Sequence, residues 1–184
     1  LATVYQVVCE RAGLPVYPAH APNHIFCRWD DGTSKLNIET TAQGEITTDR
    51  QVAGITHANL AAIKDGPYFR KASKKEVLSD QLNNLVYDLA MRKQGPAPLS
   101  WEQLIKLGDL AAKLSPKSHE ILDTAATAHF RAGNPVRALA YSDQILPLAK
   151  EYGVMPEVMA EYEKRHKEYE AGVQAKKAQP ALAP

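Results

Sequence analysis

The pattern of apolar and polar residues predicts a mixed first part of the chain and a helical remainder. Near the start, apolar residues recur at the spacing of a helix, at Leu1, Val4, Tyr5, Val8 and Ala12. Gly13 and Pro15 then favour a helix end. The segment PVYPAHAP that follows is punctuated by proline and predicts extended chain. Beyond it, HIFCRWDDGTSKLNIETT predicts two strands around a turn at Asp31-Gly32.

Alternation along these two strands predicts two different faces. The apolar face, which we expect to pack in the core, carries Ile25, Cys27, Trp29, Leu36 and Ile38. The opposite face, which holds the polar groups, carries His24, Phe26, Arg28, Lys35, Asn37 and Glu39. Candidate chemistry therefore gathers on one side of the hairpin.

The length of the turn sets which residues face each other across the hairpin. A two-residue loop at Asp31-Gly32, or a four-residue loop from Asp30 to Thr33, places His24 directly opposite Glu39 and Cys27 opposite Leu36. Residues paired in this way have Cβ atoms about 4.5–5.5 Å apart. A carboxylate at that distance holds an imidazole in one tautomer. A three-residue loop would send one partner to the core face, which the apolar pattern disfavours.

From about residue 56 onward the pattern is helical. Ser73 with Glu76 and Ser100 with Gln103 are capping boxes, in which each residue of the pair caps the other's backbone N–H. The predicted helices run from Ser73 to Gly95, from Ser100 to just before Pro116, from Ser115-Pro116 to Gly133, from Asn134-Pro135 to near Gly153, and from about Pro156 to Lys177.

Part of this helical region resembles a tetratricopeptide unit. The segment FRAGNPVRALAYSDQIL has Gly133 at the turn, Ala138 at a small-residue position and then Ile145-Leu146. Gly95 precedes Gly133 by about one 34-residue period with a short insertion. We therefore predict two tetratricopeptide-like helical hairpins over residues 73–153, capped by a charged helix over 154–177.

Composition excludes several classes of protein. The 184 residues contain 22 Lys and Arg against 21 Asp and Glu, so there is no basic excess for nucleic acid. No apolar run approaches the roughly 18 residues of a membrane helix. Two cysteines exclude a disulfide-dense scaffold. Pro22 prevents a helical metal pair between His20 and His24, and no further ligands follow, so we predict neither metal nor cofactor.

Several short motifs together resemble the transglutaminase-like superfamily. They are Gly13-Leu14-Pro15, Pro22-Asn23-His24, Asn37-Ile38-Glu39-Thr40-Thr41 and Leu82-Asn83-Asn84-Leu85. The resemblance is closest to a bacterial branch in which tetratricopeptide-type helices follow the core. It implies an α+β fold, with part of a papain-like core over residues 1–55, a connection over 56–72, the helical array after it and a tail over 178–184.

The resemblance also implies a site made of Cys, His and an acidic residue. His24 matches the family histidine, and Glu39 matches a position that is usually Asp, with Asn37 as the alternative partner. The family nucleophile is a Cys at a helix N-terminus, where the dipole lowers a thiol pKa, and its expected place is about four or five residues before Leu1. Cys9 and Cys27 are interpreted as structural thiols.

Two functions remain open from the sequence. The leading hypothesis is a non-catalytic interaction or assembly module, a possible pseudoenzyme, that binds a protein partner or peptide through the helical hairpins. The alternative is a fragment of a thiol acyltransferase or amide hydrolase in which His24 is the base and Glu39 orients it. The sequence does not indicate the cellular compartment.

Overall fold

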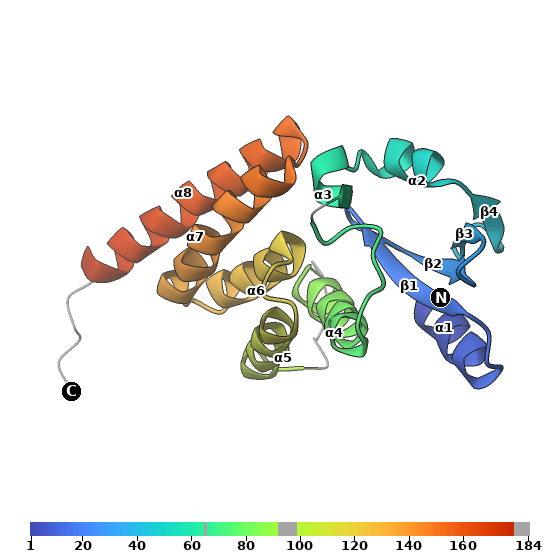
Figure 1. Ribbon diagram of the computed structural model, residues 1–184. Helices are drawn as coiled ribbons and strands as arrows, with labels where there is room; N and C mark the ends of the chain where they lie inside the picture. Colours follow the sequence, from blue (N-terminus) through green and yellow to red (C-terminus); the bar gives the residue numbers. More distant parts are fainter. Residues whose placement is uncertain (65, 92–98, 179–184) are drawn as a thin grey trace. The chain divides into compact units, whose positions relative to one another are not determined.

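A computed structural model describes residues 1–64, 66–91 and 99–178 (Figure 1). The chain divides into two compact units. The first comprises Leu1–Val77 with Tyr152–Val154, and the second comprises Leu78–Glu151 with the chain from Met155 onward. The first unit contains the described strands and the second is helical, so the predicted α+β class is confirmed.

The first unit is built on an antiparallel sheet in the order β1-β2-β3-β4. Its elements are α1 (Ala2–Arg11), β1 (Val16–Ala21), β2 (His24–Asp30), β3 (Lys35–Glu39), β4 (Glu45–Thr47), α2 (Asp49–Thr56) and α3 (Leu60–Lys64). The two predicted strands are β2 and β3. The proline-rich segment forms β1, at the edge of the sheet, where a residue without an N–H is tolerated.

The predicted register of the central hairpin is wrong by two residues. Asp30 pairs with Lys35, and Cys27 pairs with Ile38 rather than with Leu36. The reason lies in the turn, where Asp31 Oδ1 accepts hydrogen bonds from the backbone N–H groups of Thr33 at 2.9 Å and Ser34 at 2.7 Å. These bonds favour a four-residue loop over 31–34. A shift of two residues changes the partners but keeps every side chain on its predicted face.

Both faces of the sheet are covered in the first unit. The apolar face lies in the core as predicted, except at Leu36, which is 44% exposed. It packs against α1 in a core of Ala2, Cys9, Val16, Cys27 and Ile38. The opposite face is also buried, at Phe26, Arg28 and Asn37. Polar groups on that face must therefore find partners within the protein.

Helix α1 forms where it is predicted, but its apolar stripe does not face the sheet. Its buried residues are Ala2 and Cys9, whereas Val4 is 65% exposed and Val8 is 60% exposed. The small residues allow a close approach, and the Cys27 thiol lies 3.5 Å from the Ala2 carbonyl oxygen. Packing of small residues against the sheet thus determines the orientation of α1.

The helices that follow are α4 (Lys74–Met91), α5 (Trp101–Leu114), α6 (His119–Arg131), α7 (Pro135–Tyr152) and α8 (Pro156–Ala178). Both predicted capping boxes are present, at Ser73 with Glu76 and at Ser100 with Gln103. The third helix begins at His119 rather than at Pro116, because Ser118 is its N-cap and accepts from the Ile121 N–H. The predicted end of the first of these helices, at Gly95, lies outside the described residues.

Helices α6 and α8 run parallel and are joined by polar contacts. His119 Nδ1 lies 3.0 Å from the Tyr162 hydroxyl, and Thr127 Oγ1 lies 3.3 Å from the Tyr169 hydroxyl. Between these two contacts, Arg165 donates to Asp123 at 3.0 Å. Because residue numbers rise together along both helices, their directions are the same. Helix α7 connects them within the sequence.

The start of α4 carries a carboxylate whose ionisation stabilises the fold. Burial raises the pKa of Glu76, but hydrogen bonds from Arg70 and Ser73 outweigh it and lower the pKa to about 2, from 4.5. A lowered pKa contributes stability above the unfolded-state value, and this stability is lost as the pH falls through the folded-state value.

We predict that the free energy of unfolding falls less between pH 4.5 and 2 in Glu76→Gln than in the wild-type chain. The Gln side chain cannot take up a proton over this range. Urea unfolding at several pH values measures the two slopes, and equal slopes would contradict the assignment.

Candidate functional site

His24 and Glu39 are in direct contact at one end of the sheet. His24 Nε2 lies 2.5 Å from Glu39 Oε2, and both side chains are partly buried, with 26% and 16% of their surfaces exposed. His24 begins β2 and Glu39 ends β3, on the face that alternation predicts. In the observed register they are diagonal neighbours rather than directly opposite, a separation that long side chains bridge.

The carboxylate of Glu39 is held at both oxygens. Oε1 accepts from the Thr41 backbone N–H at 3.0 Å and from the Thr41 hydroxyl at 2.6 Å, while Oε2 contacts His24. Burial raises the pKa of Glu39, but the hydrogen bonds from Thr41 and His24 outweigh it and the pKa is lowered overall. Glu39 is therefore ionised at neutral pH and accepts the N–H of the imidazole.

This contact determines which imidazole nitrogen is available for chemistry. With Nε2–H donating to Glu39, the lone pair of His24 is on Nδ1. Among the described residues, Nδ1 has no hydrogen-bond partner. The arrangement is that of a base whose tautomer is fixed by a carboxylate.

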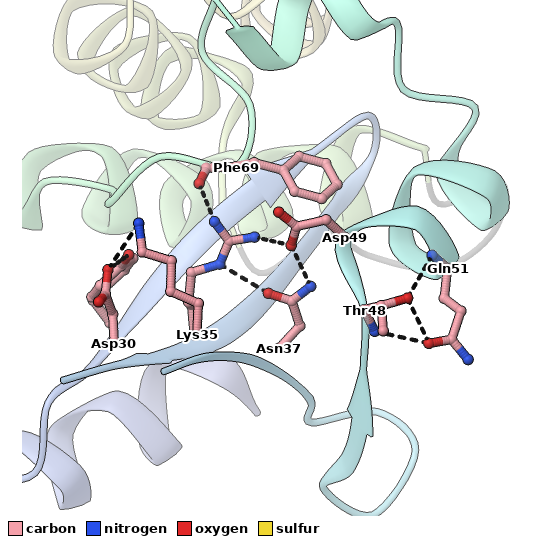
Figure 2. Close-up of polar contacts among 9 residues, drawn as sticks. Asp30, Lys35, Asn37, Thr48, Asp49, Gln51 and Phe69 are labelled. Carbon is pink, nitrogen blue, oxygen red and sulfur yellow. Dashed lines mark hydrogen bonds and ion pairs between the residues drawn. The ribbon is translucent and has the colours of Figure 1, made fainter. Parts of the chain in front are cut away.

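Asn37, the alternative partner for His24, lies elsewhere in the hydrogen-bond network. Its Oδ1 accepts from Arg28 Nε at 2.9 Å, and its Nδ2 donates to Asp49 Oδ1 at 2.8 Å (Figure 2). Asn37 is fully buried by these neighbours. The structure thus brings Glu39, and not Asn37, to His24.

A cavity of about 380 Å³ opens beside the pair. Its walls come from the ends of β2 and β3, from β4 and from α2. One wall carries Thr47, whose buried hydroxyl has no hydrogen-bond partner within the described residues. Arg50 and Gly54 of α2 also line the cavity. The oriented imidazole of His24, the unpaired hydroxyl of Thr47 and the cation of Arg50 therefore line the same cavity.

Sequence reasoning missed helix α2 and therefore this wall. A local signal was available, because Thr48 and Gln51 form a capping box at its start. Figure 2 shows the two side chains bonded to each other. The box indicates where α2 begins, but the sequence does not indicate that α2 lies near His24.

Neither cysteine of the chain belongs to this site. Cys27 lies on the face of β2 opposite His24, and Cys9 lies on α1 in the same core. Both are buried, and burial raises the pKa of the Cys27 thiol to about 11. Thiolate chemistry at neutral pH is therefore disfavoured at Cys27.

The described residues also lack two other kinds of feature. No group of three or more His, Cys, Asp or Glu side chains among them is placed to hold a metal ion. None of the helices in the described part of the chain is long and apolar enough to cross a membrane.

We predict that Thr47→Val raises the free energy of unfolding by up to about 1 kcal/mol, because it removes a buried hydroxyl that has no partner. The neighbouring Thr48→Val is the matched control. It removes the cap of α2 and should lower the free energy of unfolding by about 1 kcal/mol. Urea unfolding of both variants measures the difference, and a loss of stability in Thr47→Val would mean that its hydroxyl is bonded.

Comparisons with known proteins agree with the resemblance seen in the sequence motifs over the first part of the chain. No curated protein matches the chain, and no solved structure matches it. Residues 1–83 match the model of the family described as the transglutaminase-like superfamily. His24, Glu39 and the cavity therefore lie within the part of the chain that is similar to this family.

Proposed function

We propose that His24 and Glu39 are the base and the orienting carboxylate of a thiol-dependent acyl transfer or amide hydrolysis on protein or peptide substrates. One observation carries this proposal: the contact of Glu39 with Nε2, which leaves Nδ1 of His24 available. The match of residues 1–83 to the transglutaminase-like superfamily supports the reaction class.

In the proposed reaction a thiol gives its proton to His24 Nδ1 and attacks an amide carbonyl carbon. The imidazolium then returns the proton to the leaving nitrogen, and ammonia or an amine departs as the thioester forms. Water or a second amine attacks the thioester, which yields an acid or a new amide and restores the thiol. Glu39 stays ionised throughout and stabilises the imidazolium.

The thiol in this proposal comes from outside the 184 residues, as the family resemblance implies. Cys9 and Cys27 are buried in the core on the other face of the sheet and do not meet His24. Glu39 stands where the superfamily usually has Asp. Its extra methylene suits the diagonal position that it occupies relative to His24.

The test uses the native protein purified from the cells that express it. Each substitution is introduced into the gene of that protein. A glutamine-containing peptide and a primary amine are the probes, and the release of ammonia is the measurement. We predict that His24→Ala lowers the rate by about 10²–10⁴-fold, the usual contribution of a general base. Glu39→Gln should lower it as well, because the amide does not stabilise the imidazolium.

His20→Ala is the control, because His20 lies in β1 on the other face of the sheet and should leave the rate unchanged. A rate in His24→Ala equal to that of the unmodified protein would overturn the proposal. So would a thiol-independent rate that iodoacetamide does not reduce.

A second function has support in the helical unit. We propose that α4 to α8 form two tetratricopeptide-like hairpins with a capping helix, which bind a protein or peptide. The parallel pairing of α6 and α8 across α7 supports this architecture. Charge reversal at the exposed Lys164 and Lys167 of α8 should dissociate a native complex that His24→Ala leaves intact. A protein that sediments as a lone monomer when isolated under native conditions would contradict this function.

A further inference from the structure

Arg28 is a buried cation on the same face of the sheet as His24. Only 5% of its surface is exposed. Its guanidinium donates to Asn37 Oδ1 at 2.9 Å, to the Phe69 carbonyl oxygen at 2.8 Å and to Asp49 Oδ1. Figure 2 shows these three acceptors converging from different segments of the first unit. A buried guanidinium requires such partners, because an unpaired charge away from water is very costly.

Two of the three acceptors are bonded to each other, and the third, Phe69, is bonded to the backbone of β1. Asp49 Oδ1 also accepts from Asn37 Nδ2 at 2.8 Å, which closes a ring of hydrogen bonds among Arg28, Asn37 and Asp49. Phe69 has a φ of 60°, in the left-handed region, and its N–H donates to the His20 carbonyl oxygen at 2.8 Å. A bulky residue is rarely found in this conformation, so the surrounding contacts must hold it there.

One arm of this network reaches His24 through a stack of side chains along β2. The Arg28 guanidinium lies 5.6 Å from the centre of the Phe26 ring. Phe26 also stacks against the His24 ring, with centroids 6.3 Å apart and an angle of 16° between the planes. Phe69 packs edge-on to Phe26 at 5.3 Å and also contacts the guanidinium. Arg28 therefore holds the ring on which the imidazole rests.

The other arm reaches the cavity through α2. Asp49 is the first residue of α2, and its carboxylate is bound by Arg28 and Asn37. The residues that follow it, among them Arg50, Gly54 and Ile55, line the same cavity as His24. The bonds to Asp49 thus fix the start of α2 to the two central strands of the sheet, β2 and β3.

We infer that Arg28 is a positioning residue of this site, which holds Phe26 under His24 and holds α2 across the cavity. It touches neither the reacting atoms nor a substrate. Its importance for the reaction rests on the proposed function, but both of its mechanical roles are measurable without any reaction. A cation alone does not suffice for them, because the fork of the guanidinium is what binds three acceptors at once.

Arg28→Lys keeps the positive charge but removes the forked guanidinium, so it tests whether the fork is needed. We expect the NMR signals of the His24 ring protons to move, because the ring current of Phe26 acts on them at the observed stacking distance. We also expect amide hydrogen exchange in α2 to become at least about tenfold faster, as for the loss of one charge-assisted hydrogen bond. Both are measured well below the unfolding temperature.

Arg70→Lys is the matched control. Arg70 pairs with Glu76 in the same unit, on the surface and with no part in the cavity. It should lower stability without moving the His24 signals or selectively accelerating exchange in α2. A purely structural Arg28 would behave in the same way as this control.

Of the contacts that Arg28 makes, Asp49→Asn weakens only the one with α2. It is the variant to measure if Arg28→Lys does not fold. Exchange in α2 should accelerate while the His24 signals stay in place, because the contact between Arg28 and Phe26 remains. Unchanged exchange in α2 of Asp49→Asn, or unchanged His24 signals and exchange in a folded Arg28→Lys, would overturn the inference. Neither result bears on whether His24→Ala lowers the rate of acyl transfer, so the two proposals fail separately.

Discussion

Burial of one guanidinium organises the first unit. A covered sheet face with a cation at its centre is stable only if the surrounding chain brings acceptors to that cation. Arg28 obtains an amide oxygen from β3, a carboxylate from α2 and a carbonyl oxygen from Phe69. The same contacts bring the end of the sheet, α2 and the aromatic side chains together around His24.

Strand alternation explains why His24 and Glu39 were correctly predicted to meet although the predicted register was wrong. Glu39 reaches His24 from a diagonal position, two residues away from the one that the turn motif predicted. A slip of two residues keeps both side chains on the same face, whereas a slip of one would have separated them. The contact therefore depends on the face and on the length of the Glu side chain more than on direct pairing.

The features that the sequence predicted well have local causes. The capping boxes at Ser73 and Ser100 place the starts of α4 and α5, since each box is complete within four residues. The turn of the hairpin was harder, because Asp31-Gly32 favours a two-residue loop while the Asp31 carboxylate stabilises a longer one. Two local preferences compete there, and the sequence does not indicate which prevails.

The features that were missed depend on contacts distant in the sequence. The apolar stripe of α1 predicted its helix but not its orientation, which follows from the close packing of Ala2 and Cys9 on the sheet. The cavity depends on Arg28 binding a carboxylate that lies in a helix after β4. His24 and Glu39 were found because alternation and a family resemblance coincide at the same two residues.

The proposed chemistry depends on Glu39 fixing the tautomer of His24 so that Nδ1 is available. Nitrogen NMR of the neutral His24 ring tests it most directly, because the protonated and unprotonated ring nitrogens have well-separated ¹⁵N shifts. We expect a proton on Nε2 and a lone pair on Nδ1, and we expect this pattern of shifts to change in Glu39→Gln. A proton on Nδ1, or rapid exchange between the two tautomers in the unmodified protein, would contradict it.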